Sequence, residues 1–224
     1  GRGFGKTRMG AQWVREKALA DPQARIAIIG ATLAEARSVM VEGESGILRI
    51  SGDERPDWEP SLRRLKWNNG AVATLYSAAE PESLRGPQHS HAWADEVAKW
   101  QNGNAAWDNL MLGLRVGDNP QAMATTTPRS VALLKRLLAQ DGVVVTRGGS
   151  AANIAALSAG FLDQMRTLYA GTRLEKQELM GELISEPDGA LWSLELIESR
   201  RVGDARLPDM KRIVIGVDPP AGSV

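Results

Sequence analysis

The chain has 224 residues, which suits one large domain or one domain joined to part of another. It contains no cysteine and only two histidines, His89 and His91, which excludes disulfides, thiol catalysis and cysteine metal sites and argues against a histidine-rich metal site. Its 27 basic and 27 acidic residues cancel, so any contact with nucleic acid would have to use a local patch.

Short apolar, β-branched runs alternate with helical patterns along most of the chain. Such runs are typical of strands that are buried on both faces, and their alternation with helices predicts an α/β fold with three layers around a mainly parallel sheet. No apolar run is long enough to span a membrane. The predicted strands are residues 25–31, 70–77, 91–95, 121–126, 142–146 and 212–217, and the predicted helices are residues 7–19, 33–42, 104–114, 130–140, 160–168 and 177–183.

The alternation stops after Thr146, and residues 147–208 have the glycine and proline breakers of loops between helices. The run KRIVIGVDPP then predicts a new strand. That strand either opens a second domain, of which the chain holds only the beginning, or returns to the first sheet. We expect a sheet domain over residues 1–147, a helical linker over 148–208 and the start of a further domain over 209–224.

The chain begins with the glycine-rich sequence GRGFGKTR, whose end fits the phosphate-loop pattern G-x-x-x-x-G-K-[ST]. The first glycine of that pattern would fall one position outside the chain. Gly3 and Gly5 would let the backbone turn its amide groups towards an anion, and the helix that follows favours negative charge at its start. Lys6 can reach the outer phosphates and the Thr7 hydroxyl can bind Mg²⁺, so we expect ATP and Mg²⁺ here. A glycine-rich turn without a ligand is the alternative.

An acidic pair, Asp95 and Glu96, follows the predicted strand 91–95. A phosphate-loop enzyme needs a second Mg²⁺ anchor at the carboxyl end of a neighbouring strand, which suits Asp95. It also needs a group that polarises the attacking water, which suits Glu96. Taken alone, such a pair would more often cap a helix, but the upstream glycine-rich loop favours the catalytic interpretation.

Two arginines and a row of threonines are further candidates. Arg2 lies inside the glycine-rich loop, and Arg85 lies in a loop rich in proline and glycine that could reach a neighbour's site and neutralise charge on the transferred phosphoryl group. Each could also be a solvated surface arginine, and for Arg85 the spacing alone favours that alternative. Thr125, Thr126 and Thr127 end a predicted strand, where they could contact the attacking water or cap the next helix; the residues alone favour capping.

Together these motifs resemble the large terminase subunit, the DNA-packaging motor of tailed bacteriophages and gene transfer agents. GRGFGKTR resembles its phosphate loop with an internal arginine, WADE its metal-and-glutamate motif, and TTTP its coupling motif. YAGTRLEKQELMGELI followed by GALW resembles the stretch that leaves its ATPase domain, and IVIGVDPPAG the first strand of its RNase H-like nuclease domain. The chain departs from the family pattern at both ends. At its start, the strand before the phosphate loop is missing, with the segment that contacts adenine. At its end, only the first strand of the nuclease domain is present.

The resemblance implies a RecA-like P-loop ATPase domain over residues 1–147, a linker over 148–208 and the first strand of a truncated nuclease domain over 209–224. It implies that ATP hydrolysis drives double-stranded DNA into a capsid. The partners would be the portal protein, the small terminase subunit and further copies in a ring, in the cytoplasm of a bacterial host and without a membrane.

The resemblance also implies a role for each matching residue. The nucleotide-binding residues would be Gly1, Arg2, Gly3, Phe4, Gly5, Lys6, Thr7 and Arg8. Thr7 and Asp95 would hold Mg²⁺, Glu96 would activate water, Arg2 would act in cis, and Arg85 would act on the neighbouring subunit. Thr125, Thr126 and Thr127 would couple hydrolysis to movement, and Asp218 would be the first carboxylate of the nuclease site.

Two alternatives remain open from the sequence. A helicase-like DNA-dependent ATPase shares the loop and the acidic pair, but further arginine-bearing motifs and a second motor domain would be expected. A non-catalytic assembly module of the packaging machine would not need Lys6, Asp95 and Glu96. A two-metal nuclease needs several carboxylates, so we expect endonuclease activity only of the full-length protein.

Overall fold

The structure is a computed structural model that describes residues 1–158, 160–184 and 200. The chain divides into two units, residues 1–185 and 186–224. The predicted strand 212–217 and Asp218 lie outside the described residues, and so does most of the predicted linker beyond residue 184.

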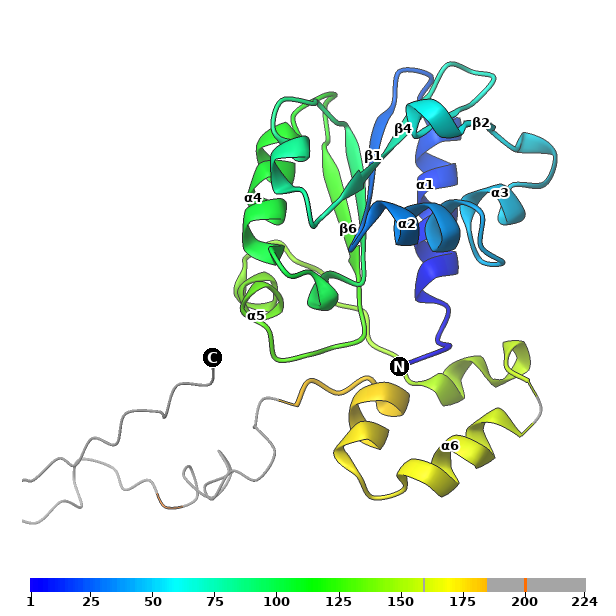
Figure 1. The fold of residues 1–224 in the computed structure, drawn as a ribbon, viewed down its shortest axis with the longest axis vertical. Coiled ribbons are helices and arrows are strands. Elements are labelled where there is room, and N and C mark those ends of the chain that lie inside the picture. The colour runs from blue at the N-terminus through cyan, green and yellow to red at the C-terminus, as the bar shows by residue number, and fades with distance from the viewer. Residues whose placement is uncertain (159, 185–199, 201–224) are drawn as a thin grey trace, which may run out of the picture. The chain divides into compact units, whose positions relative to one another are not determined.

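Six strands and six α-helices, with short π-helical and 3₁₀ segments, make up the described part (Figure 1). The strands are β1 (Arg25–Gly30), β2 (Asp57–Glu59), β3 (Arg64–Lys66), β4 (Val72–Ser77), β5 (His91–Asp95) and β6 (Gln121–Thr125). The α-helices are α1 (Lys6–Ala20), α2 (Leu33–Glu35), α3 (Ile47–Ile50), α4 (Gly103–Gly113), α5 (Ala132–Ala139) and α6 (Phe161–Tyr169). The π-helical segments are η1 (Ala36–Val41) and η7 (Glu175–Met180), and the 3₁₀ segments are η2 (Gly52–Glu54), η3 (Pro60–Leu62), η4 (Pro81–Leu84), η5 (Val97–Lys99) and η6 (Ser150–Ala156).

The strands form one sheet in the order β2-β3-β4-β1-β5-β6. The neighbours from β4 to β6 run parallel, whereas β2 and β3 add an antiparallel hairpin at one edge. The predicted α/β fold with a mainly parallel sheet is therefore confirmed. Because parallel strands end at one edge, the ends of β5 and β6 lie together, with Asp95 opposite Thr125 in the register.

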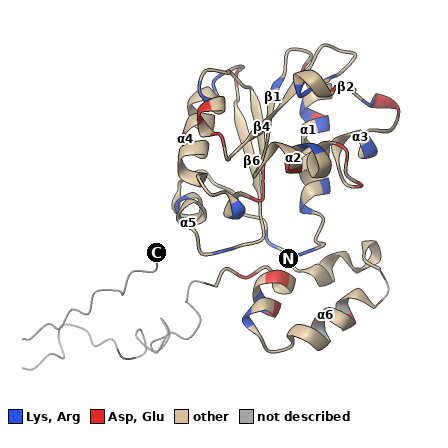
Figure 2. Cartoon of the chain, in the orientation of Figure 1, with Lys and Arg blue, Asp and Glu red and all other residues tan. Residues whose placement is uncertain are grey.

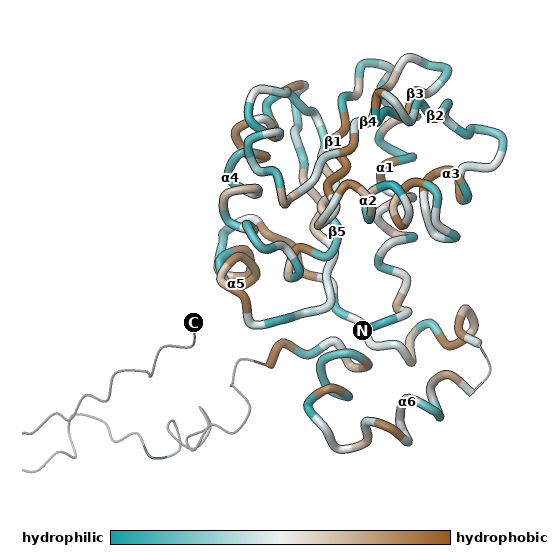
Figure 3. Tube along the Cα trace, viewed as in Figure 1, coloured by the Kyte–Doolittle hydropathy of each residue, from teal (hydrophilic) through white to brown (hydrophobic). Residues whose placement is uncertain are grey.

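Two apolar clusters, one on each face of the sheet, hold the helices in place. One cluster joins the sheet to α1, η1 and α3, and the other joins it to η5, α4 and α5. The central strand β1 is apolar throughout its buried length, as the brown trace in Figure 3 shows, because both of its faces are covered. These clusters give the predicted three layers.

Charged residues lie mainly on helices and loops, and those of the central parallel strands stand at strand ends (Figure 2). Arg25 opens β1 and Asp95 closes β5. Asp95 is therefore an ionisable group at the end of a central strand that is otherwise free of acidic and basic side chains except for His91. None of the helices within the described residues has the length and apolar character that a membrane span requires.

The predicted strand over residues 142–146 is wrong. Residues 143–149 have no ladder partner among the described residues, and the side chain of Val144 is 92% exposed. A groove of about 650 Å³, lined by both segments, lies between these residues and β6. Because the valine run lies across this groove from β6, it cannot form the hydrogen bonds of a sheet with that strand.

The other elements predicted within the described residues are present, most of them with shifted ends. The predicted helix 33–42 is a short α-helix, α2, followed by the π-helical η1. The predicted helix 177–183 corresponds to η7, which ends at Met180; the next residue, Gly181, has a left-handed backbone conformation. The hairpin of β2 and β3 was not predicted, because its strands are only three residues long and mostly charged.

Candidate functional site

The glycine-rich loop leads directly into α1. Gly3 (φ 71°) and Gly5 (φ 98°) adopt backbone conformations that favour glycine, and Gly5 is the residue that precedes the first helical position, Lys6. The free amide groups of the first turn of α1 therefore follow a tight loop, as an anion site requires. Thr7 is the second residue of the helix and lines the same cavity as the loop.

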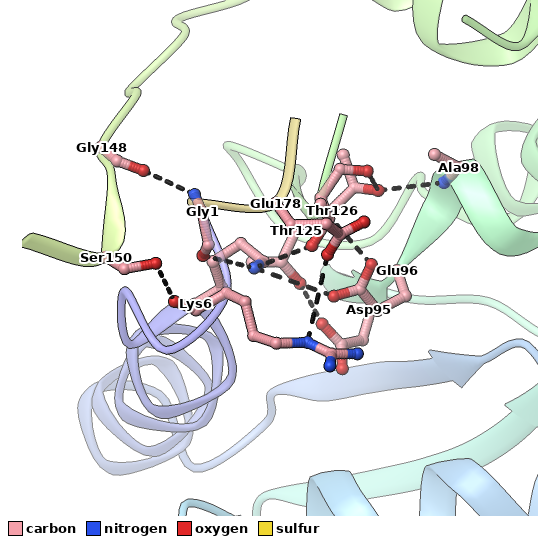
Figure 4. Close-up of polar contacts among 12 residues, drawn as sticks. Gly1, Lys6, Asp95, Glu96, Ala98, Thr125, Thr126, Gly148, Ser150 and Glu178 are labelled. Carbon is pink, nitrogen blue, oxygen red and sulfur yellow. Dashed lines mark hydrogen bonds and ion pairs between the residues drawn. The ribbon is translucent and has the colours of Figure 1, made fainter. Parts of the chain in front are cut away.

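The Lys6 side chain extends from the loop towards the ends of β5 and β6 (Figure 4). Its Nζ donates to the Gly1 carbonyl at 3.0 Å and to Thr127 Oγ1 at 3.2 Å, and it lies 3.9 Å from Glu96 Oε1. The side chain is only 15% exposed. A cation is thus held at the wall of a cavity by one carboxylate and two neutral oxygens.

The acidic pair is divided between two backbone conformations. Asp95 ends β5, whereas Glu96 is left-handed (φ 50°, ψ 47°), a conformation that costs a residue with a side chain about 1–3 kcal/mol. In a continuing strand the two side chains would point to opposite faces of the sheet. The turn at Glu96 instead lets both carboxylates line one cavity.

Each threonine at the end of β6 contacts a different part of the acidic segment. Thr125 Oγ1 donates to Asp95 Oδ1 at 2.5 Å, Thr126 Oγ1 accepts from the Ala98 amide at 3.1 Å, and the Thr127 amide donates to Glu96 Oε2 at 3.0 Å. The prediction that these hydroxyls cap the next helix is wrong. Val131 precedes α5, and its side chain has no polar atom that could cap the helix. Among the described residues, the hydrogen-bond partners of the three hydroxyls, Asp95, Ala98 and Lys6 among them, all lie outside α5.

A cavity of about 1290 Å³ joins these parts. Its lining combines the loop, the acidic pair and Thr127 with side chains from η6, η7 and the segment after β1. Thr7 and Asp95 offer it the hard oxygen ligands that Mg²⁺ prefers. In the described part of the chain, no three acidic or histidine side chains gather to bind a metal ion by themselves. A cation held by Thr7 and Asp95 would need the remaining ligands from water and phosphate oxygens.

Asp95 is buried, and burial raises the pKa of its carboxyl to about 6. The neighbouring Glu96 charge raises the pKa as well, whereas the hydrogen bond from Thr125 and the Lys6 charge lower it. The protein surroundings alone therefore make the carboxylate costly to ionise, and a divalent cation beside it would favour the charged form.

Replacing Asp95 with asparagine is expected to stabilise the protein at pH 7 in the absence of nucleotide and Mg²⁺, by up to roughly 3 kcal/mol. The native carboxyl loses its proton near pH 6 and the unfolded one near pH 4, so ionisation of Asp95 removes stability as the pH rises between those values. Urea denaturation from pH 4 to pH 7 should show that the free energy of unfolding of the variant exceeds that of the wild type by an amount that grows with pH.

The comparison of the two proteins isolates Asp95 from other titrating groups. His89 is buried, and burial lowers its pKa to about 4, so it adds stability as the pH rises over the same range. That contribution is common to both proteins and cancels in the difference. If the difference in the free energy of unfolding between the two proteins were the same at pH 4 and pH 7, this would contradict the raised pKa of Asp95.

The predicted arginines lie in two different places. Arg2 and Arg8 line the cavity, and Arg2 Nε is 4.0 Å from Glu178 Oε2. Arg85 is not in the cavity; its side chain is 73% exposed and lies 3.7 Å from Glu82. Asp218 is outside the described residues.

Residues of η6 and η7, which lie outside the predicted motifs, form hydrogen bonds with the glycine-rich loop. The Arg2 amide donates to the Glu178 carbonyl at 2.5 Å, Ser150 Oγ donates to the Arg2 carbonyl at 2.5 Å, and Asn153 Nδ2 donates to the Gly3 carbonyl at 2.8 Å. Sequence reasoning missed these residues, since contacts to backbone groups require no recognisable motif. The break in pattern after Thr146 was the only signal that a different kind of segment begins there.

Comparison with known proteins gives one family and a set of solved structures. The family model described as "Terminase large subunit, T4likevirus-type, N-terminal" matches residues 1–199. The large terminase of a thermophilic bacteriophage is similar in fold (TM-score 0.64, 13% identity), over 78% of this chain and 44% of that one. The large terminase ATPase domain of Thermus phage P74-26 is similar too (TM-score 0.59, 17% identity), over 82% of this chain and 86% of that domain.

The chain thus spans less than half the length of the thermophilic bacteriophage protein. Other structures of that same terminase were solved in complex with ADP (TM-score 0.63, 15% identity, 78% of this chain and 44% of that one) and with ATP-γ-S (TM-score 0.63, 13% identity, 81% and 46%). At these identities the structures show a shared fold. No curated protein matches the chain.

Proposed function

The chain belongs to the terminase large subunit family, and from this premise we propose that residues 1–147 are the ATP-hydrolysing domain of a DNA-packaging motor. The whole protein would drive double-stranded DNA into the capsid of a virus or gene transfer agent. One observation carries the proposal: Lys6 and Glu96 lie 3.9 Å apart on the wall of one cavity, with Thr127 bonded to both. The nucleotide complexes of the thermophilic bacteriophage terminase support ATP as the ligand.

In the proposed mechanism the loop and the start of α1 bind the phosphates. Backbone amides and Lys6 would neutralise their charge, and Phe4 and Arg8, which line the same cavity, would help to enclose the nucleotide. Thr7 and Asp95 would hold Mg²⁺, which when bound would offset charge on the phosphate oxygens. Arg2 would approach the phosphates in cis after leaving Glu178.

Glu96 would accept a proton from the attacking water. The Thr127 amide holds one carboxylate oxygen, Oε2, and leaves Oε1 on the side of Lys6. When phosphate binds, the Lys6 ammonium group would turn from Glu96 Oε1 towards the ligand. The Glu96 carboxylate would then be free to orient water. Positioning and charge stabilisation would supply the catalysis.

The threonines would couple hydrolysis to movement. Thr126 is bonded to the start of η5 and Thr127 to both Lys6 and Glu96, so a shift of Glu96 would be felt at the segment that leads to α5. Residues 148–208 would form the linker, and residues 209–224 the first strand of an RNase H-like nuclease domain with Asp218 as its first ligand. Endonuclease activity would need the full-length protein.

The assay that tests this proposal is ATP-dependent DNA packaging by the full-length protein with empty capsids that carry the portal protein, with and without the small terminase subunit. The proposal requires Mg²⁺-dependent ATP hydrolysis together with protection of DNA from added nuclease. Strand separation of a duplex without packaging would favour the helicase-like alternative. Packaging without hydrolysis by this chain would favour an assembly module.

Arg85 is expected to act on the neighbouring subunit of a ring, because its exposed side chain lies outside its own cavity. Arg85→Ala should lower the rate of hydrolysis about a thousandfold or more, and Glu96→Gln about a hundred- to ten-thousand-fold. A mixture of the two full-length variants should recover activity, since a subunit with intact Glu96 can then receive Arg85 from its neighbour. A mixture as inactive as its components would contradict a role between subunits. Arg115→Ala, at another exposed arginine outside the cavity, is the control and should keep the wild-type rate.

A further inference from the structure

Trp93 lies in the middle of β5, two residues before Asp95, and is fully buried. Side chains two residues apart on a strand point to the same face, so Trp93 and Asp95 both face the layer that contains α1. The Trp93 ring belongs to the apolar cluster that holds α1 on the sheet. Trp93 thus packs against the helix that starts at Lys6 and stands on the same strand as the carboxylate at the end of β5.

The packing of α1 on Trp93 is unusually close. A methyl group on Gly10 would overlap the Cε2 and Nε1 atoms of the indole, so no larger side chain fits at this position without a shift of the ring or the helix. Gly10 therefore lets the backbone of α1 rest on the edge of the ring that carries the N–H group. The position of this N–H group is fixed by the helix on one side and the sheet on the other.

The indole N–H is connected to Asp95 through one hydroxyl. Trp93 Nε1 donates to Thr125 Oγ1 at 3.0 Å, and Thr125 Oγ1 lies 2.5 Å from Asp95 Oδ1, with all three groups buried. An indole can only donate, so the hydroxyl must accept from it. The single hydroxyl proton is then directed at Asp95 rather than at the Ala94 carbonyl, which is 3.4 Å away.

We propose that Trp93 is a positioning residue for the metal-binding carboxylate: its indole N–H orients the Thr125 hydroxyl so that Asp95 is held as a hydrogen-bond acceptor in one geometry. The inference rests on the proposed function, in which Asp95 binds Mg²⁺. Trp93 itself is fully buried and does not line the cavity. It links the packing of the helix that begins with Lys6 and Thr7 to the orientation of Asp95 across the cavity.

The test compares two buried tryptophans in the full-length protein. Trp93→Phe keeps an aromatic ring and removes the N–H group, and Trp67→Phe makes the same change at a tryptophan of the same cluster whose Nε1 has no hydrogen-bond partner among the described residues. Trp93→Phe should raise the Mg²⁺ concentration for half-maximal binding of a fluorescent ATP analogue by about three- to tenfold, the effect of losing one hydrogen bond between uncharged groups. Trp67→Phe should leave that concentration within about twofold of the wild-type value.

A third variant, Thr125→Val, keeps both tryptophans and removes the hydroxyl. It should raise the Mg²⁺ concentration for half-maximal binding, as Trp93→Phe does. The double variant should need no more Mg²⁺ than Thr125→Val alone, because Trp93 acts on Asp95 only through the Thr125 hydroxyl. In the absence of nucleotide, Thr125→Val should shift the ¹⁵N and ¹H resonances of the Trp93 indole, which Trp93→Phe assigns by their loss.

The outcomes separate the two proposals. Equal Mg²⁺ requirements in Trp93→Phe and Trp67→Phe, additive effects in the double variant, or an unshifted indole resonance in Thr125→Val would each overturn the role of Trp93. A wild-type protein that binds no ATP would instead contradict the proposed function, while a shifted indole resonance would still support the hydrogen-bond chain.

Discussion

Glu96→Gln is expected to lower the rate of ATP hydrolysis about a hundred- to ten-thousand-fold and to leave the affinity for ATP within a few-fold of the wild-type value. Glutamine keeps the size of the side chain and can still accept from the Thr127 amide, so the turn at the end of β5 should survive. Glutamine cannot take a proton from the attacking water, so the rate of ATP hydrolysis should fall. Steady-state hydrolysis and equilibrium binding of a fluorescent ATP analogue are the two measurements.

A matched control is available in the same cavity. Glu44 is an exposed carboxylate that lines the cavity with Glu96, and Glu44→Gln removes the same charge. It should hydrolyse ATP at the wild-type rate. If Glu96→Gln kept more than about a tenth of the wild-type rate, or if Glu44→Gln lost as much as Glu96→Gln did, Glu96 would not be the catalytic base.

Lys6→Met is expected to weaken ATP binding by about ten- to a hundredfold and to reduce hydrolysis further, since charge-assisted hydrogen bonds to phosphate are among the strongest polar contacts in proteins. Methionine preserves the length and the apolar stem of the side chain. The loss should appear in both the dissociation constant and the maximal rate, because Lys6 would contact the phosphates before and during transfer. Binding titrations and saturation kinetics distinguish the two.

Lys99→Met serves as the control for this variant. Lys99 lines the same cavity, but its Nζ is bonded to Glu35 Oε1 at 2.7 Å and its side chain is about half exposed. Its replacement should leave ATP affinity within about twofold. Equal losses in both variants would mean that the cavity attracts phosphate by overall charge and not through Lys6. Thermal denaturation should show that both variants fold.

The meeting of the glycine-rich loop with the acidic pair could be predicted because it depends on strand order and on motif chemistry together. Parallel strands end at one edge, and a helix that opens with Lys6 and Thr7 must start near that edge if it packs on the same sheet. The conformation of Glu96 could not be predicted in this way, since a left-handed glutamate has no sequence signature. The alternation of the strand alone would have placed its carboxylate on the opposite face from Asp95.

Where prediction failed, tertiary neighbours decided the outcome. The valine run at residues 142–146 has the composition of a strand, but it forms no ladder with the described strands. The threonines at the end of β6 have the composition of a helix cap, yet α5 begins only at Ala132 and they bond to the acidic segment instead. The partners of Arg2 and Gly3 from η6 and η7 are distant in sequence and bind backbone atoms, so residue types alone could not identify them.

The most direct test of the proposed nucleotide site is a crystal structure of the full-length protein with Mg²⁺ and a non-hydrolysable ATP analogue. We expect the terminal phosphate to lie against Lys6 and the start of α1, with Thr7 and Asp95 beside the metal and Glu96 facing a water in line for attack. A nucleotide bound elsewhere, or phosphates directed away from the acidic pair, would contradict the proposed site.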